Sequence, residues 1–245
     1  MPPAEQKQQP VALLTDWNGT ASAHISQPLL QSGFAVLING TQDEVFRYPI
    51  FEPTAKVLAL PFDITNEAAI NAALASGIDY LGEIDVLVNN LNFWNDAALD
   101  DITDTMWTEV LHLGIKGTFN CCRVASKIMR AQKFGKIINI ISTSAITGTY
   151  TQYAAGCAAI QSLTRSLARE LAPHVRINSI ATGLVDEPWI DEDGPEFRKM
   201  LTKDIPLGRL CKNEDIAEAV CYHACGADFM TGQMLVLDGG ESMGG

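Results

Sequence analysis

Basic residues and long apolar runs are both scarce in this chain of 245 residues. Lysine and arginine number 17 against 29 acidic residues, which gives a formal net charge of −12 at pH 7. Nucleic acids and anionic membranes select for basic surfaces, so we expect neither of them as a partner. No stretch reaches the roughly 20 consecutive apolar residues that a membrane span requires. The composition therefore predicts a soluble, acidic protein.

The amino-terminal end and the cysteines point to the cell interior. The first ten residues are polar and lack the apolar core of a secretory signal, so we expect a cytoplasmic protein. The six cysteines then predict free thiols rather than a disulfide framework. Hydrophobic residues make up 47% of the chain, enough for the core of one sizeable domain. We predict a polar tail at residues 1–10 and a single domain at residues 11–245.

Short apolar runs alternate with helical stretches along the chain. The runs are rich in valine, isoleucine and leucine, as is typical of strands covered on both faces. The predicted strands are Val11–Leu14, Ala35–Ile38, Val57–Leu60, Val86–Val88, Ile137–Ile141, Ile177–Ile180 and Met234–Leu237. The predicted helices are Ala21–Gln31, Glu67–Leu81, Thr103–Gln132, Tyr153–Leu171 and Glu214–Ala224. This alternation predicts a doubly wound α/β fold, a Rossmann-like parallel sheet with helices on both faces.

One long stretch carries no clear period. Gly183–Leu207 contains prolines and an acidic cluster. Irregular segments of this length often form a flap beside a functional site, which is one interpretation. A solvated surface loop is the other.

Several motifs stand in the order of one known family. They are Thr15 after the first strand, Asp63 in PFDIT, Asn89-Asn90 after the fourth strand, KGTFN at 116–120, GKIINI at 135–140, Tyr153, PLGRLCKNEDIAEAV at 206–220 and TGQMLVLDGG at 231–240. With them, the chain from Val11 to Gly240 resembles the short-chain dehydrogenases/reductases. The resemblance implies the fold above, and in an intact member an NAD- or NADP-dependent oxidoreductase.

The phosphate-binding turn departs from the pattern that the resemblance implies. Members carry TGxxxGxG, but residues 15–22 read TDWNGTAS, with Asp16, Thr20 and Ser22 in place of the glycines and Gly19 one position off. A carboxylate at Asp16 would repel a pyrophosphate at the helix N-terminus. We therefore predict that the cofactor-binding set is vestigial and that this chain binds no nicotinamide cofactor. That set is Thr15, Asp16, Gly19, Ser22, Asp63 and Asn89. A shifted turn in which Asn18 and Gly19 still hold phosphate stays open.

The adenosine side of the implied cofactor site also departs from the pattern. NAD-binding members place an acid at the end of the second strand, and NADP-binding members place a basic residue near it, but this chain has Asn39. Pro49 and Pro53 predict that the following helix is shortened or lost.

The implied proton-transfer set has lost its cation. Family enzymes use serine, tyrosine and lysine with a helical asparagine, and here Ser142 and Tyr153 match the first two. Cys157 stands at the lysine position and Gly114 at the asparagine position. Without a nearby cation, a tyrosine that titrates near ~10 is rarely ionised at neutral pH and is a weak general base. We therefore expect no catalytic residue, with Ser142 and Tyr153 as vestiges.

Metal binding is not predicted. Cys221 and Cys225 would share one face of a helix, but no second pair of ligands lies near them in the sequence. A zinc site needs about four such ligands. We interpret the CYHAC segment as a buried helix with small thiols.

The retained parts of the sequence favour association. Small residues follow Tyr153 on its helix, and TGQMLVLDGG is intact; in the family both regions take part in assembly. We hypothesise a non-catalytic subunit of a heteromeric dehydrogenase, most simply a heterotetramer. Its partner would be an active paralogue that binds NAD or NADP and acts on a hydroxyacyl-CoA, as in anaerobic aromatic degradation. One alternative is an active oxidoreductase that uses Tyr153 and Ser142. Another is a homo-oligomeric ligand-binding or regulatory protein.

Overall fold

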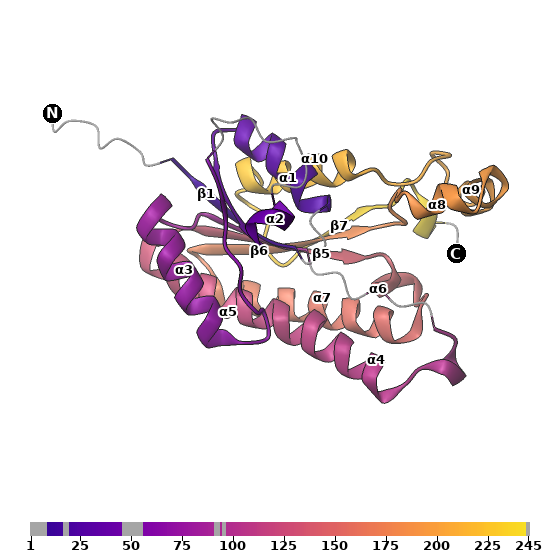
Figure 1. The fold of residues 1–245 in the computed structure, drawn as a ribbon, viewed down its shortest axis with the longest axis horizontal. Coiled ribbons are helices and arrows are strands. Elements are labelled where there is room, and N and C mark those ends of the chain that lie inside the picture. Colours follow the sequence, from indigo (N-terminus) through magenta and orange to yellow (C-terminus); the bar gives the residue numbers. More distant parts are fainter. Residues whose placement is uncertain (1–8, 17–19, 46–55, 91–93, 95–96, 244–245) are drawn as a thin grey trace, which may run out of the picture.

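The computed structural model describes residues 9–16, 20–45, 56–90, 94 and 97–243. Seven parallel strands form one sheet in the order β3-β2-β1-β4-β5-β6-β7 (Figure 1). The strands are β1 Val11–Asp16, β2 Ala35–Asn39, β3 Val57–Ala59, β4 Val86–Asn90, β5 Gly135–Ser142, β6 Val175–Thr182 and β7 Met234–Leu237. All seven predicted strands are present, and the predicted single-domain, doubly wound fold is confirmed.

Helices cover both faces of the sheet, as Figure 1 shows. One face carries α1 Thr20–Gln31 and α10 Asn213–Cys225, and the other carries α3 Glu67–Leu81, α5 Thr118–Gln132 and α7 Thr151–Leu171. The remaining helices are the short α2 Gln42–Val45, α4 Asp104–Glu109, α6 Ser144–Thr147, α8 Trp189–Glu192 and α9 Pro195–Thr202, with 3-10 turns at Leu99–Asp101 and Glu241–Met243. In the described part of the chain, no helix is long and apolar enough to cross a membrane.

The residues of β1 explain why the sheet is covered on both sides. Val11 and Leu13 point into the apolar cluster under α3, α5 and α7, whereas Ala12 and Leu14 point into the cluster under α1 and α10. All four side chains are buried, because successive strand residues face opposite sides of a sheet. This is the pattern of continuous apolar residues from which the strands were predicted.

The long helix predicted at residues 103–132 is not a continuous α-helix, so that prediction is wrong in its detail. A π-helical segment at Val110–Gly117 separates α4 from α5. The segment contains Gly114 and Gly117, both buried, and glycine weakens an α-helix by about 1 kcal/mol relative to alanine. Wide turns of this kind are rare and frequently lie at functional sites.

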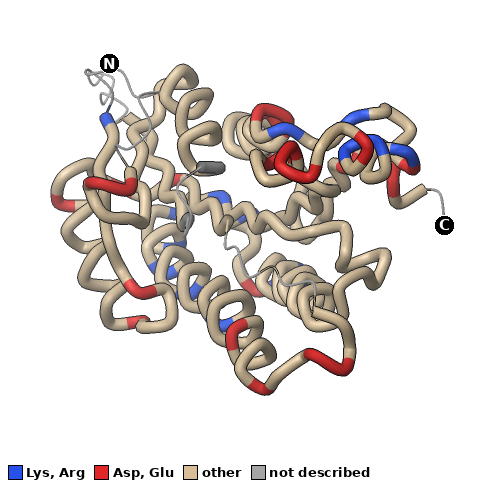
Figure 2. Tube along the Cα trace, turned by 45° about the vertical axis from the view of Figure 1, so that its right-hand side comes forward, with Lys and Arg blue, Asp and Glu red and all other residues tan. Residues whose placement is uncertain are grey.

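The segment Gly183–Leu207 is not the irregular surface loop that one interpretation expected. It carries α8 and α9, which pack a small apolar cluster of their own around the fully buried Ile190. Arg198 on α9 makes a two-pronged ion pair with Asp186, at 2.7 and 3.0 Å, and also bonds Asp191. Figure 2 shows acidic and basic residues gathered on this part of the molecule. Its action as a flap stays a prediction.

Between β2 and β3, the described residues include the helix α2, Gln42–Val45. The predicted shortening of the helix there stays a prediction. Residues 46–55, which include Pro49 and Pro53, lie outside the described part of the chain.

Candidate functional site

The strand order of the sheet locates the site. The order reverses between β1 and β4, and open parallel sheets bind ligands at the carboxyl ends of their strands beside such a reversal. The last residues of the two strands, Asp16 and Asn90, are register partners there. Gly19 and the side chain of Asp16 lie outside the described part of the structure, so their predicted roles stay predictions.

Thr15 and Asn89 bond to the protein itself. Both are buried, and the Thr15 hydroxyl lies 3.3 Å from both Asn89 Oδ1 and the Val88 carbonyl oxygen. The Thr15 hydroxyl oxygen also accepts a bond from the Asn90 backbone N–H. These two predicted cofactor-binding residues therefore tie β1 to β4.

The same bonds continue into a polar network across the sheet. Asn89 Nδ2 donates to Asn139 Oδ1 at 2.8 Å and lies 3.3 Å from the Cys122 sulfur. Asn139 Nδ2 donates to the Thr164 hydroxyl at 2.8 Å, and this hydroxyl donates in turn to the Ile160 carbonyl. We call Thr15, Asn89, Asn139 and Thr164 the amide network; all four are buried. It links β1, β4, β5 and α7.

The polar side chains at the adenosine side also bond locally. Asn39 Oδ1 accepts the backbone N–H of Phe62 at 2.9 Å, which ties the end of β2 to the next strand connection. Asp63 is exposed, and its Oδ1 accepts both the backbone N–H and the hydroxyl of Thr65. Ser22 is buried on the inner side of α1. The described groups at this side thus stabilise turns and helices.

The structure brings Ser142, Tyr153 and Cys157 together, as the resemblance implied. The Tyr153 hydroxyl is a hydrogen-bond partner of both the Ser142 and the Cys157 side chains, and the thiol also contacts the Ser142 backbone. Ser142 ends β5, and the other two lie one turn apart on α7. The contact forms although only eleven residues separate Ser142 from Tyr153. We call these three residues the tyrosine site.

The surroundings of the tyrosine site are apolar. Cys157 is fully buried in a cluster with Val110, Ile141 and Ile160, and Tyr153 packs against the same cluster. Burial raises the pKa of the Tyr153 phenol well above its ordinary value of 10, and the contact with Cys157 raises it further. Burial also raises the pKa of the Cys157 thiol. Among the described residues, no lysine or arginine offsets these shifts, so both groups hold their protons at neutral pH.

Gly114 contributes no side chain to this region. It lies buried in the π-helical segment, which packs against α7. The wide turn is therefore present at the position where the resemblance implies an asparagine, but the polar group is not. The described residues of the tyrosine site form no chain of proton donors and acceptors through this segment.

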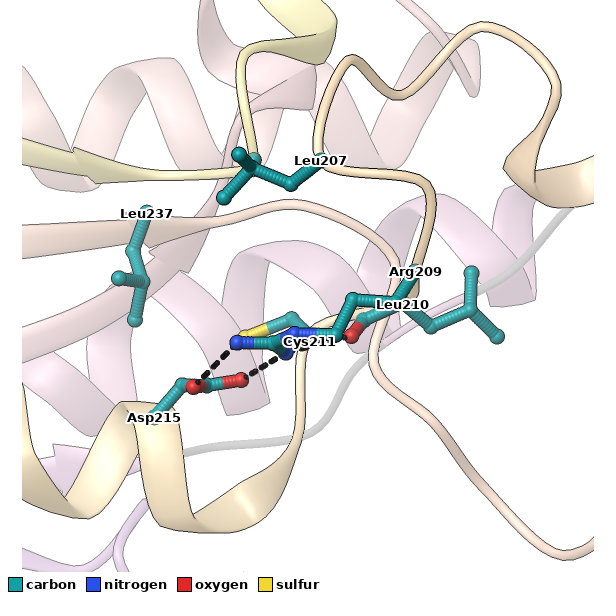
Figure 3. Close-up of a pocket in the computed structure, with 7 residues that line it drawn as sticks. Leu207, Arg209, Leu210, Cys211, Asp215 and Leu237 are labelled. Carbon is teal, nitrogen blue, oxygen red and sulfur yellow. Dashed lines mark hydrogen bonds and ion pairs between the residues drawn. The ribbon is translucent and has the colours of Figure 1, made fainter.

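A pocket lies apart from the tyrosine site, beside the end of β7. Leu207, Arg209, Leu210, Cys211, Asp215, Leu237 and Gly239 line it (Figure 3). Arg209 makes a two-pronged ion pair with Asp215 on α10, at 2.5 and 2.8 Å, so the two charges at this pocket are paired with each other. Burial raises the pKa of the Cys211 thiol to about 12, which keeps it protonated. The ion pair at this pocket thus connects the segment before α10 to the first turn of that helix.

The CYHAC segment differs from the predicted buried helix. His223 is buried, but Cys225 is exposed and Cys221 is partly exposed, so the prediction is wrong for these thiols. Among the described residues, no group of three or more histidine, cysteine or acidic side chains could hold a metal ion.

Sequence reasoning missed an aromatic group near the tyrosine site. Trp94 follows β4, Tyr150 directly precedes α7, and Trp189 begins α8. Their rings contact one another although they are 44%, 43% and 40% exposed. The only signal in the sequence is the presence of aromatic residues in connecting segments, and their separation along the chain hides the contact.

The chain is similar in sequence to known reductases and dehydrogenases. The family profile described as Enoyl-(Acyl carrier protein) reductase matches residues 19–242. The (2S)-[(R)-hydroxy(phenyl)methyl]succinyl-CoA dehydrogenase subunit BbsD of Thauera aromatica is 34% identical over 96% of this chain and 98% of its own length. The 3-oxoacyl-[acyl-carrier-protein] reductase FabG of Thermotoga maritima is 32% identical over 76% of this chain and 77% of its own.

Solved structures agree in fold. A short-chain dehydrogenase/reductase from Serratia marcescens superposes with a TM-score of 0.85 at 29% identity, covering 96% of this chain and 98% of its own. A gluconate 5-dehydrogenase from Burkholderia cenocepacia, in complex with NADP and tartrate, also gives 0.85, at 27% identity and 95% coverage of both chains. Full-length coverage in both directions leaves no large domain of these proteins unmatched.

Proposed function

This chain belongs to the short-chain dehydrogenase/reductase family of oxidoreductases, and on that premise we propose that it is a non-catalytic subunit of a hetero-oligomeric dehydrogenase. Its partner is a catalytically active paralogue that binds NAD or NADP. The chain itself binds no nicotinamide cofactor and transfers no hydride. It completes the oligomer, most simply a heterotetramer in the cytoplasm, and stabilises the active partner.

The state of Tyr153 carries the proposal. A phenol accepts a substrate proton only as phenolate, and the fraction of phenolate falls tenfold for each unit by which the pKa exceeds the pH. The apolar cluster around Cys157 moves this pKa upward, in the opposite direction from the one that base catalysis requires. A protonated thiol next to the phenol supplies no compensating charge.

The polar groups at the implied cofactor site support the same conclusion. The oxygens of Asn39, Asp63 and Thr15 already accept or donate bonds within the protein. A dinucleotide that recruited them would break those bonds for a small net gain. The fit of the described residues to a nicotinamide dinucleotide is therefore poor, and no step of the proposed function involves this chain's own cofactor.

Two exposed apolar surfaces suit an assembly role. On one, Trp107 and Leu111 lie one turn apart on α4 and the π-helical segment, 39% and 48% exposed, next to α7 with its exposed Ala155 and Ala158. Large exposed apolar patches mark interaction sites in soluble proteins. The second surface surrounds β7, which has no strand beyond it in the described chain. Phe229, Tyr222 and Val236 are exposed there.

The relative from Thauera aromatica supports a subunit role and indicates a substrate class. That protein is named as a subunit of a dehydrogenase for an acyl-CoA with a hydroxyl group. We extend this to the active partner proposed here, which would oxidise a hydroxyacyl-CoA.

A second candidate function rests on one contact. The hydrogen bond between Ser142 and Tyr153 is preserved, and it lowers the pKa of Tyr153 slightly against the larger effect of burial. An active oxidoreductase with an unusual cofactor pose would use these two side chains. The binding experiment below separates the candidates.

The test measures cofactor binding and assembly separately. The purified chain is titrated with NADH and NADPH by fluorescence, with the intact paralogue from the same organism as the positive control. We expect no binding to this chain at micromolar concentrations and saturable binding to the paralogue. Micromolar binding by this chain alone would support the oxidoreductase and reject the non-catalytic subunit.

Assembly is tested by co-expression and size-exclusion chromatography. We expect this chain and the active paralogue to elute together, and Trp107→Glu to separate them because a charge enters the apolar surface of α4. The matched control is Tyr80→Glu, which changes a 74% exposed aromatic residue on α3 and should leave the complex intact. A chain that forms stable homo-oligomers and ignores the paralogue would contradict the proposal.

A further inference from the structure

Two thiols lie one turn apart at the carboxyl end of α10. Cys225 is the last residue of this helix, and Cys221 lies four residues before it. Residues four apart on a helix are neighbours on its surface, with about 5–6 Å between their Cβ atoms. Cys225 is exposed and Cys221 is partly exposed, so solvent reaches both residues. Cys121 and Cys122 on α5 differ in both respects, because they are buried and adjacent helix residues do not face each other.

The Cys221 thiol interacts with Cys225 and with the end of a second helix. Burial raises the pKa of Cys221 to about 11, and the nearby Cys225 contributes to the rise. The side chain of Ser32 is a hydrogen-bond partner of the Cys221 thiol. Ser32 is exposed and directly follows α1, which lies beside α10 in Figure 1. The two thiols therefore lie close together at the surface, where α1 and α10 end.

The last turn of α10 is held in place from two sides. The backbone N–H of Gly226 donates to the Tyr222 carbonyl oxygen at 3.1 Å and closes the helix. From β5, the buried Lys136 ammonium donates to the carbonyl oxygens of Ala224 and Gly226, at 3.0 and 2.5 Å. A cation at a helix C-terminus also interacts favourably with the helix dipole. Since helix ends otherwise fray, these bonds keep the two thiols at their helical spacing.

The number of ligands selects the kind of ion that this pair suits. Thiolates are soft ligands that favour Cu(I), zinc and iron–sulfur clusters. Zinc takes about four ligands, and among the described residues no third histidine, cysteine or acidic side chain joins the pair. Thiolate bonds of about 2.3 Å place two sulfurs on opposite sides of one ion about 4.6 Å apart, within reach of two side chains at this spacing. The net charge of −12 also favours a cation.

We propose that Cys221 and Cys225 form a two-coordinate binding site for a soft monovalent metal ion of the Cu(I) class. Each thiol releases its proton to the solvent, and a lone pair of each sulfur forms the bond to the ion. Two protons therefore leave for each ion bound, and no electron is transferred. Binding needs neither Tyr153 nor a nicotinamide cofactor, so the site goes beyond the proposed function and does not depend on it.

Competition with a coloured chelator measures the affinity of this site. The reduced full chain, in its purified oligomeric state and without oxygen, is loaded with one equivalent of Cu(I) and titrated with bicinchoninate. We expect Cys221→Ser and Cys225→Ser each to weaken Cu(I) binding by more than about a hundredfold, because loss of an outer-shell partner alone typically costs about 10–100-fold. Cys211→Ser is the matched control, since it removes another partly exposed thiol, and it should leave the affinity unchanged.

Zinc tests the number of ligands. The parent chain and Cys225→Ser should bind Zn(II) equally weakly, because two thiolates leave zinc short of its four ligands. Equal Cu(I) affinity in the parent and both single variants, an equal loss in Cys211→Ser, or Zn(II) binding that depends on both thiols would overturn the two-coordinate site. Cys225 is exposed, so its replacement by serine leaves the core intact, and its Cu(I) affinity decides the matter even if Cys221→Ser is unstable.

Discussion

The amide network and the tyrosine site lie on the same two elements and have opposite character. Asn139 and Ser142 both belong to β5, and Thr164 and Cys157 both belong to α7. In the network, Asn139 accepts a bond from Asn89 and donates one to Thr164. At the tyrosine site, a phenol and a thiol meet in apolar surroundings, and burial disfavours the charged form of each.

The difference separates what the fold requires from what catalysis requires. A buried amide without partners destabilises the fold whether or not the chain is catalytic, so the satisfied network stabilises this chain in either case. A cation beside the tyrosine stabilises a phenolate and matters only when protons are transferred. A chain maintained for assembly would keep the first and lose the second, as this one has under the proposal above.

The largest loss of stability is expected when Asn139, the residue at the centre of the amide network, is replaced. Asn139→Leu keeps the approximate shape of the side chain but removes a hydrogen-bond partner from both the Asn89 amide and the Thr164 hydroxyl, which retain only the Cys122 sulfur and the Ile160 carbonyl oxygen. We expect the free energy of unfolding to fall by about 3 kcal/mol, since the loss of a partner costs about 1–3 kcal/mol for each buried polar group. Urea denaturation measures this. Ser142→Ala, at the last residue of β5, is the control, and an equal loss there would show that the two regions do not differ.

Restoring the cation at the tyrosine site is expected to have the next largest effect. Cys157→Lys places an ammonium group among Val110, Ile141 and Ile160, where described acidic partners are absent. We expect a loss of about 2 kcal/mol in the free energy of unfolding. We expect no NADH-dependent turnover, because the phosphate-binding turn is unchanged.

Cys157→Ala controls for loss of the thiol contact with Tyr153 and should cost less. Stability is followed by urea denaturation and turnover by the absorbance of NADH with an acyl-CoA substrate. Measurable turnover in Cys157→Lys would mean that the cation was the sole missing element, and the chain would then be a recoverable enzyme.

The sequence predicts most of the fold and part of the site. Features that depend on residues close together in the sequence are predictable, and features that depend on contacts between distant segments are not. The strands are predictable because continuous apolar runs such as Val11–Leu14 satisfy two cores at once. The contact between Tyr153 and Cys157 is predictable because residues four apart share a helix face. The π-helical segment is not, since the apolar spacing around Gly114 fits an α-helix equally well.

Contacts between distant segments account for the remaining differences. Helices α8 and α9 are short, and their stability comes from Ile190 and from the Arg198 ion pairs, which no local pattern reveals. The stacking of Trp94 on Trp189 likewise requires two connections 95 residues apart to meet. The sequence alone does not indicate which residues such aromatic side chains contact.

His223 is a buried group, without hydrogen-bond partners in the described structure, whose protonation should make the stability depend on pH. It is 3% exposed, and neither ring nitrogen has a hydrogen-bond partner among the described residues. Burial lowers its pKa below the ordinary 6.5, and nearby Lys136 lowers it further. Its stabilising contribution is therefore complete above about pH 6.5 and declines as the pH falls, because the unfolded chain binds a proton that the folded chain does not.

We expect the free energy of unfolding to fall by up to about 1.4 kcal/mol per pH unit below pH 6.5 from this residue. Urea denaturation of the parent chain and of His223→Phe between about pH 7.5 and 5.5 isolates the contribution, because the phenylalanine cannot titrate. The exposed His174 supplies the control, His174→Gln, which should keep the parent's slope. A His223→Phe variant with that same slope would show that His223 does not titrate in this range.

The smallest expected effect is a gain in stability, at a buried amide that lacks hydrogen-bond partners in the described part of the chain. Gln152 is fully buried beside Tyr153, yet neither its amide nitrogen nor its amide oxygen has a partner among the described residues. Gln152→Leu replaces an unsatisfied amide by an apolar group of similar size, so we expect about 1 kcal/mol of added stability in urea denaturation. Asn139→Leu, which makes the same kind of change inside the amide network, should lower it. Opposite signs for these two substitutions would establish that hydrogen-bond satisfaction, rather than burial alone, decides how a buried amide contributes to stability, and a loss in both would refute it.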